Sequence, residues 1–486
     1  MSQINVLQID EMTLDQLQTY FENEGITSSE LVKYYLKRIA LYDQSGPTIN
    51  SILEINPEAL FIARSLDTER KNRVIRGPLH GVPVLLKYNI DTGDQMHTSA
   101  GSIALENHYA KKDAYIVKKL RDAGAVILGK ANMTEWANFM AYNMPNGYSS
   151  RGGQVLNPYG PGELDVSGSS SGSGAAVACN FTMLAVGTET SGSILCPAGN
   201  NNIVGIKPTV GLVSRTGIIP ISFSQDTAGP MARNVKDAAI LLEILTGYDP
   251  EDSATHSAPP VVSYMEGLPH ASLKGKRLGV AYDFCIKNLS EIQKSVFDQA
   301  LFDLSKAGAE IVHLDQISPV EKKNSIDYHV LLHEFKSGIN HYLKTVSPSL
   351  GLQTLSDIIA FNEKNKAGCL KYNQELLIES NKTGGTLTSP DYINSRLNDL
   401  EHTQNNGIDL VMHENQLDAL ISPNDVWYGI PAKAGYPSIS VPSGFDKNGM
   451  PLSIIFTAEA FSEKKLIEFA YVYEKSTQMR KPIKFS

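Results

Sequence analysis

Residues 113–128, DAYIVKKLRDAGAVIL, contain the pattern that decides the fold class. The apolar residues of IVKKL recur at helical spacing, so they predict one buried helix face, with Asp113 as the N-terminal cap. Gly124 is the residue type that ends a helix, and the apolar AVIL after it has the composition of a buried strand. A helix, a glycine and a strand in direct succession indicate an α/β protein with a largely buried sheet.

The same order of elements recurs outside this stretch. Residues 292–314 again predict a helix, a stopping glycine at position 308 and a strand. The further elements that the patterns predict are a helix over 27–41, buried strands at 82–86, 437–442 and 452–456, and a final helix capped by Ser462.

Composition and charge narrow the class of protein. The chain has 486 residues, of which 42% are hydrophobic and 20% charged, as in ordinary globular proteins. Its net charge of -9 argues against a surface that neutralises phosphates, so no nucleic-acid partner is expected. The polar, acidic N-terminus does not resemble a secretory signal, which predicts a cytoplasmic protein.

The apolar segments and the cysteines point to a buried interior. The longest apolar stretch near the middle, Ala175–Val186, is too short to span a bilayer and reads as a buried helix, so no membrane association is expected. Cys179, Cys196, Cys285 and Cys369 lie far apart without CxxC spacing. They predict buried, unpaired thiols and neither a zinc site nor a disulfide framework.

Two regions differ in texture from the rest. Residues 147–229 are rich in Gly and Ser, which is typical of flexible linkers, but interleaved apolar segments and regular prolines favour a folded region with tight turns. Residues 250–410 are more charged and weakly patterned, with surface excursions expected at Lys322–Asn324 and Asn381–Gly385. The weak pattern favours a region that varies with substrate.

One segment matches the nucleophile elbow of Ser-His-Asp hydrolases. Residues 168–172, GSSSG, fit G-x-S-x-G, and His402 and His413 are possible bases. The elbow must follow a buried strand, whereas NPYGPGELDVS before it contains no strand pattern. The sequence therefore disfavours the elbow.

A lysine offers a different base. Lys87 ends the apolar strand VPVLL, where burial would lower the pKa of its amine enough for it to accept a proton from serine. The alternative is a structural lysine whose amine reaches solvent from the strand end.

Three segments of the chain resemble a known family. The segments GPLHGVPVLLKYNID (77–91), SGSSSGSGAAVA (167–178) and GTETSGSILCPAGNNNIVGIKPTVGLVSRTGIIP (187–220) are similar to the amidase signature family. The resemblance is strong from about Gly77 to Arg233 and weak between about 255 and 410. It implies a single α/β/α domain with a mixed, mostly parallel sheet. Within it we expect an N-terminal helical segment (1–70), a signature core (71–250) and a C-terminal part (251–486) whose region 255–410 is variable.

The resemblance also implies roles for residues. The catalytic lysine falls on Lys87, the bridging serine on Ser169 and the acyl-forming serine on Ser193. The family's oxyanion hole falls on the backbone N–H groups of Thr190, Ser191, Gly192 and Ser193, with Gly192 permitting a tight turn. The reaction implied is amide hydrolysis to acid and ammonia without a metal or organic cofactor.

Departures from the family pattern bear on the substrate. Tyr88 stands where the family usually has an acid, Glu189 where it has Asp, Ser191 where it has Gly, and Leu195 where many members have Arg. Leu195, Cys196 and Ser170 are the predicted pocket residues, and the apolar pair Leu195–Cys196 favours neutral, hydrophobic acyl groups. The segment GTETSGSILCP (187–197) followed by KPTVGLVSRTGIIPISFSQDTAGPMAR (207–233) resembles the peptide-amidase branch of the family, which removes the C-terminal amide of peptides.

Two alternatives remain open. The A subunit of the tRNA-dependent glutamine amidotransferase shares the triad and works with tRNA and a partner protein. A non-catalytic binding protein on an amidase scaffold belongs to another class altogether. The expected partner is a small-molecule or peptide amide substrate, and the protein is expected to be a monomer or homodimer.

Overall fold

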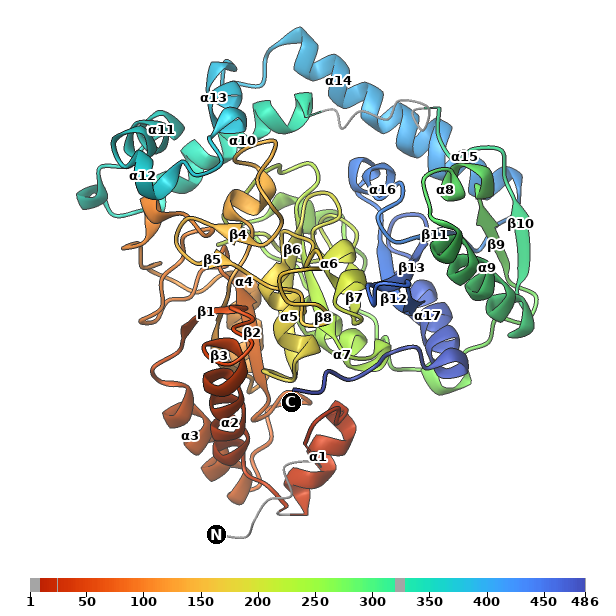
Figure 1. Ribbon diagram of the computed structural model, residues 1–486, viewed down its shortest axis with the longest axis horizontal. Coiled ribbons are helices and arrows are strands. Elements are labelled where there is room, and N and C mark those ends of the chain that lie inside the picture. Colours follow the sequence, from red (N-terminus) through yellow and green to blue (C-terminus); the bar gives the residue numbers. More distant parts are fainter. Residues whose placement is uncertain (1–8, 24, 320–327, 486) are drawn as a thin grey trace.

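The computed structural model describes residues 9–23, 25–319 and 328–485. The excursion predicted at Lys322–Asn324 lies outside these residues. Within them the chain forms an 11-stranded sheet with the strand order β1-β3-β2-β6-β8-β7-β12-β13-β11-β9-β10, and a separate β4-β5 pair (Figure 1).

The strands are β1 (Ile52–Ile55), β2 (Pro83–Lys87), β3 (Val126–Ala131), β4 (Tyr148–Ser149), β5 (Gly153–Gln154), β6 (Leu184–Glu189), β7 (Val204–Lys207), β8 (Thr227–Ala232), β9 (Arg277–Val280), β10 (Glu310–His313), β11 (Ala419–Pro423), β12 (Ser438–Phe445) and β13 (Pro451–Thr457). The helices are α1 (Leu14–Glu22), α2 (Ser28–Arg38), α3 (Ala59–Lys71), α4 (Tyr115–Asp122), α5 (Ser171–Ala178), α6 (Leu195–Asn200), α7 (Val235–Leu245), α8 (Tyr282–Ile286), α9 (Glu291–Lys306), α10 (His329–Tyr342), α11 (Leu355–Lys364), α12 (Lys366–Cys369), α13 (Glu375–Lys382), α14 (Pro390–Leu400), α15 (Asp409–Glu414), α16 (Gly429–Ala434) and α17 (Glu463–Thr477).

The sheet is mixed, as predicted, but it is not mostly parallel. Parallel pairing joins β3, β2 and β6 at one end and β11, β9 and β10 at the other. The strands between them pair antiparallel, and β1 adds an antiparallel edge. The physical reason is connection length: β12 and β13 are joined by a short turn, which only antiparallel neighbours allow.

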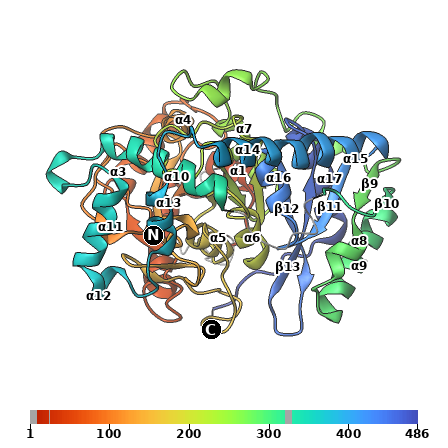
Figure 2. The same cartoon turned by 90° about the horizontal axis from the view of Figure 1, so that it is seen from above.

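Strands β3, β2 and β6 are covered on both faces. Every residue of β2, β3 and β6 is buried, so the sheet lies between layers of helices in an α/β/α arrangement. Figure 2 shows α10 to α13 gathered at one end of the molecule and α8, α9, β9 and β10 at the other.

Residues 113–128 fold largely as their pattern predicts. They form α4, a turn at Gly124 with φ +81° and then β3. Asp113, however, does not cap α4: the cap position is Ala114, and the Asp113 carboxylate accepts from the Gly93 amide at 2.8 Å and pairs with Arg121. The predicted cap is wrong because loop and helix neighbours outcompete the helix terminus for this carboxylate.

Ala175–Val186 is buried but is not one helix. α5 ends at Ala178, Asn180 adopts φ +55° in the following turn, and β6 begins at Leu184. A short, fully buried apolar run has no polar face, so periodicity alone cannot separate a helix from a strand. All four cysteines are buried, as predicted.

The weakly patterned region contributes a second apolar cluster. α10, α11 and α13 pack their apolar side chains against the segments that follow β2 and β3. Phe335 of α10 contacts Trp136 and Phe139, with ring centroids 6.2 and 5.0 Å apart. These helices therefore cover the edge of the sheet where β2, β3 and β6 end. None of the helices in the described part of the chain is both long and apolar enough to cross a bilayer.

Candidate active site

Lys87 is the last residue of β2, and none of its surface is exposed. Its amine lies 2.7 Å from Ser169 Oγ and 2.9 Å from both the carbonyl oxygen and the hydroxyl of Thr188. The structural alternative required the Lys87 amine to reach solvent, and it does not. The side chain ends in a site with three oxygen partners.

Burial lowers the pKa of Lys87 to about 7, and the carboxylates of Glu189 and Asp226 oppose this shift. Lys130 and Lys207 are also fully buried, and burial lowers the pKa of each to about 8. The amine of Lys207 donates to backbone carbonyls, and that of Lys130 to carbonyls and a threonine. Among these three lysines, Lys87 is the one whose amine contacts a serine.

Ser169 lies just before α5, after a cis peptide bond from Gly168. Its carbonyl accepts from the Thr134 amide at 3.1 Å, which ties it to the segment after β3. No strand occurs among residues 155–170, so GSSSG does not follow a strand as a nucleophile elbow must. The structure agrees with the sequence in disfavouring the elbow.

Ser193 lies between β6 and α6, and it is 6% exposed. Its carbonyl accepts from the Ser170 amide at 3.2 Å, which places the segment around Ser193 beside Ser169 and Ser170. Among the described residues the Ser193 hydroxyl has no hydrogen-bond partner, so it is not joined directly to Ser169 Oγ. Gly192 before it has φ +80°, and a Cβ there would lie 2.9 Å from the Tyr428 ring. Only glycine fits this turn without strain.

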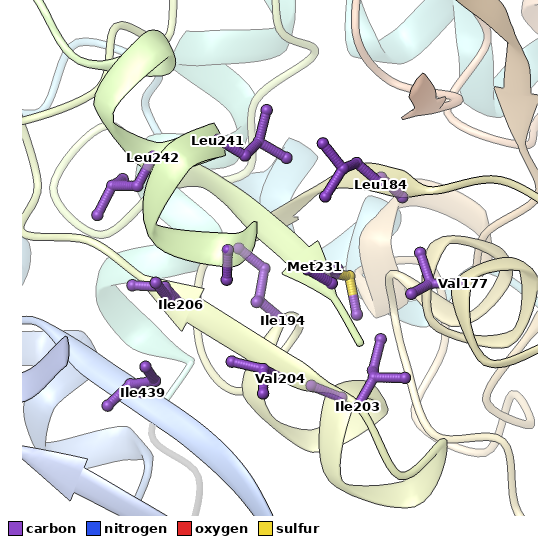
Figure 3. Packing of buried hydrophobic residues seen from close by; sticks show 14 of the residues in the cluster. Val177, Leu184, Ile194, Ile203, Val204, Ile206, Met231, Leu241, Leu242 and Ile439 are labelled. Carbon is purple, nitrogen blue, oxygen red and sulfur yellow. The ribbon is translucent and has the colours of Figure 1, made fainter. Parts of the chain in front are cut away.

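Ile194 anchors the turn in the core. Its side chain approaches Gly187 of β6, Gly205 of β7 and Gly229 of β8, where Cβ atoms would lie 3.0–3.1 Å from it. Figure 3 shows Ile194 among Val204, Ile206 and Met231 of the same strands. Three neighbouring strands thus leave room for one side chain, which fixes the residue next to Ser193.

The backbone amides of the turn divide into two sets. The Gly192 amide donates to Glu189 Oε1 at 2.8 Å, so one of the four predicted oxyanion donors is already engaged. In the described part of the chain, the amides of Thr190, Ser191 and Ser193 have no acceptor. The Thr190 hydroxyl donates to Asp226 at 2.5 Å.

The predicted pocket residues are buried around the turn. Ser170 has no exposed surface, and its hydroxyl donates to the Thr188 carbonyl at 3.1 Å and accepts from the Thr188 amide at 3.2 Å. Leu195 is fully buried and Cys196 is 5% exposed, both in α6. The hydroxyl of Ser170 therefore holds the backbone of Thr188 in place.

A cavity of about 760 Å³ lies beside the site, and it is lined neither by Lys87, Ser169 or Ser193 nor by the predicted pocket residues. Thr188 and Thr190 form its boundary with the site, and Ile219 and Ile221 provide apolar wall. Tyr342 of α10 closes it from the weakly patterned region.

Sequence reasoning missed three supporting residues: Thr188, Glu189 and Asp226. Glu189 carried a usable signal, because an acid at the end of a buried strand and three residues before a glycine turn can accept the amides of that turn. Asp226 gave no such signal, since it reaches Thr190 only through the pairing of β6 with β8.

Comparison with known proteins gives consistent results. The profile of the amidase family matches residues 30–425. A probable amidase of Arabidopsis thaliana is 40% identical over 98% of this chain and 92% of its own length. The A subunit of the glutamyl-tRNA(Gln) amidotransferase of Prochlorococcus marinus is 31% identical over 97% of this chain and 98% of its own.

The solved structures point the same way. The native peptide amidase of Stenotrophomonas maltophilia superposes with a TM-score of 0.92 at 43% identity, covering 98% of this chain and 99% of that one. A peptide amidase in complex with the competitive inhibitor chymostatin gives a TM-score of 0.93 at 43% identity, covering 98% and 100%. From this family match, these relatives and a shared fold along nearly the whole chain, it follows that the protein belongs to the amidase family.

Proposed function

We propose that this amidase hydrolyses the C-terminal amides of peptides, with Ser193 as nucleophile, Ser169 as proton bridge and Lys87 as base. The observation that carries the proposal is the 2.7 Å contact between the buried Lys87 amine and Ser169 Oγ. A base of this kind must hold its partners in both protonation states, and the surroundings of Lys87 permit both.

A neutral lysine has two N–H donors and one lone pair. The two Thr188 oxygens, each 2.9 Å from Nζ, accept the two donors, which leaves the lone pair for the Ser169 hydroxyl proton. When the amine is charged, Ser169 Oγ accepts its third N–H instead. Proton transfer therefore requires no rearrangement around the lysine.

In the first half-reaction Ser193 Oγ attacks the amide carbonyl carbon. Its proton passes to Ser169, whose own proton passes to Lys87. Catalytic hydrogen bonds often tighten only when substrate is bound, which is consistent with the unpaired Ser193 hydroxyl here. The amides of Thr190, Ser191 and Ser193 stabilise the negative oxygen of the tetrahedral intermediate.

The intermediate then breaks its C–N bond. The leaving nitrogen takes the proton back through Ser169 and departs as ammonia, leaving the acyl group as an ester on Ser193. Water attacks the ester with the same relay as base, and the free carboxylic acid and the Ser193 hydroxyl are restored. One amide and one water give one acid and one ammonia.

The peptide substrate is supported by two lines of evidence. The peptide amidases above are 43% identical along nearly the whole chain, and one is inhibited by chymostatin. The cavity beside Thr188 and Thr190 also has the volume of a small-ligand pocket and apolar wall from Ile219 and Ile221. We assign it to the acyl side of the substrate, where it favours neutral, apolar residues.

The test is an ammonia-release assay on the purified chain. C-terminally amidated peptides ending in apolar residues should release ammonia faster than glutamine or a malonamate-like amide, with Ser193→Ala as the inactive control. A requirement for glutamyl-tRNA would instead favour the amidotransferase assignment. If no amide releases ammonia, the binding-protein alternative replaces the hydrolase.

A further inference from the structure

We infer that Glu189 is a positioning residue that fixes the nucleophile turn through its carboxylate and removes the Gly192 amide from the oxyanion hole. This inference rests on the roles proposed above for Ser193 and Lys87. It assigns to Glu189 a task that acts through the turn, without contact with the substrate.

The contacts of Glu189 bracket the nucleophile on both sides. Oε1 accepts the Gly192 amide at 2.8 Å, and Oε2 accepts the amides of Ile194 and Leu195 at 2.6 and 3.0 Å. The bound amides thus belong to the residue before Ser193 and the two after it. A single side chain fixes the path of the backbone through Ser193.

The carboxylate is held here without a direct ion pair. Glu189 is 1% exposed and forms no salt bridge with any residue of the described ranges. A buried carboxylate needs donors, and three amides supply them. Its fit is specific to an acid, because a carboxamide would turn an NH₂ group toward at least one of these N–H donors.

The position of Glu189 at the end of β6 links the turn to the base. Thr188 directly before it holds the Lys87 amine, and Thr190 directly after it bonds to Asp226. Glu189 and Asp226 are the two acidic groups whose charges act on Lys87. Removing the charge of Glu189 therefore affects the lysine as well as the turn.

Three variants test the inference: Glu189→Gln, Glu189→Asp and the control Glu463→Gln. Glu463 is 2% exposed and accepts the Thr209 amide at 2.7 Å, but its charge acts on Lys207. Glu463→Gln therefore also removes a buried carboxylate that accepts a backbone amide, but this carboxylate is not one of those that act on Lys87. For each variant we measure kcat, KM, the pH profile of kcat/KM and the thermal midpoint.

Glu189→Gln should lower kcat about 10²-fold with little change in KM, because the nucleophile is displaced and not the binding site. Its ascending pH limb should move to lower pH, since the charge that favours protonated Lys87 is gone. Glu189→Asp keeps the charge but shortens the reach, so its limb should stay while kcat falls. Glu463→Gln should match the wild type in kcat, KM and pH limb.

The inference is overturned if Glu189→Gln keeps the kcat and pH limb of Glu463→Gln. If Glu189→Gln does not fold, Glu189→Asp decides: a wild-type kcat in that variant overturns the inference. Failure of the proposed function is distinguishable, because then either the wild type releases no ammonia or Ser193→Ala remains active, whatever the Glu189 variants do.

Discussion

At the scale of single residues, the behaviour of the site depends on one amine. Lys87 has no exposed surface, and burial lowers the pKa of its side chain to about 7 against the opposing charges of Glu189 and Asp226. A neutral amine can accept a proton from serine and a charged one cannot. The pH at which Lys87 loses its proton should therefore set the lower pH limit of activity.

We expect kcat/KM for an amidated peptide to fall about tenfold per pH unit below about 7, the pKa of Lys87. The same shift affects stability with a definite sign. Because the folded-state pKa lies below the ordinary value of 10.5, the unfolded state binds more protons between about 7 and 10.5, and the contribution of Lys87 to stability rises with pH across that window. A pH-rate profile that is flat from 5 to 8 would contradict the role of Lys87.

Replacement of Lys87 by arginine separates a base from a fixed positive charge. Arginine keeps the charge but does not lose its proton in the working pH range, so Lys87→Arg should be as inactive as Lys87→Ala. The measurement is kcat on an amidated peptide for folded samples of both variants. Substantial turnover by the arginine variant alone would rule out the proton relay.

Sequence alone supplied part of this site. The resemblance pointed to Lys87, Ser169 and Ser193. In the structure the Lys87 amine contacts Ser169, and the segment around Ser193 lies beside Ser169. The engagement of the Gly192 amide by Glu189 was missed, because a family pattern identifies which amides are near but not which acceptor they choose.

At the scale of elements, sequence patterns predicted where the helices lie better than which residues cap them. Thr27, the first residue of the helix predicted over 27–41, caps α2 with a full capping box. Ser462 occupies the cap position of α17, but its side chain makes no cap hydrogen bond. Asp113 binds Gly93 and Arg121 and does not cap α4. Whether a polar side chain caps its helix depends on competing partners that lie far away in sequence.

These two caps form a matched pair for mutation. Thr27→Ala should reduce stability by about 1 kcal/mol, since it leaves the Glu30 amide without its partner at 3.2 Å. Ser462→Ala should change stability by less than about 0.5 kcal/mol, because no cap hydrogen bond is lost. Thermal unfolding of both variants gives the comparison, and turnover should be unchanged in each. Equal loss in the two variants would contradict the capping assignment.

At the scale of the whole molecule, segments near the two termini, around Glu11 and Arg480, are joined to the helix that follows Ser169. Arg480 binds both carboxylate oxygens of Glu11 at 2.7 and 2.8 Å and also donates to the carbonyls of Ala178 and Asn202. Ala178 is the last residue of α5. The segments around Glu11 and Arg480 therefore stabilise α5, the helix that follows Ser169.

Arg480→Leu should lower stability by about 2 kcal/mol, less than for a fully buried pair, because the side chains of Arg480 and Glu11 are 13% and 27% exposed. Lys112 and Glu251 form an ion pair whose side chains are 67% and 60% exposed, so Lys112→Ala should leave the thermal midpoint unchanged. If both variants lose the same stability, the pair of Arg480 and Glu11 has no special role.

Long-range order was the part of the fold that sequence could not supply. Helix and strand patterns predicted β2, β3 and β12 and an α/β class, but not that antiparallel strands would join two parallel groups into one sheet. That order depends on which strands meet across the core. The three glycines that make room for Ile194 show the same limit, since only the pairing of β6, β8 and β7 in the sheet brings Gly187, Gly205 and Gly229 around one side chain.

The central claim is that Ser193 is the nucleophile of a serine hydrolase, and covalent labelling of the intact protein tests it most directly. The wild type should react with one equivalent of a fluorophosphonate, and peptide mass spectrometry should locate the label on Ser193. Ser193→Ala should remain folded and unlabelled, whereas Ser170→Ala should still be labelled on Ser193. A label found on Ser170, or one that persists in folded Ser193→Ala, would contradict the account.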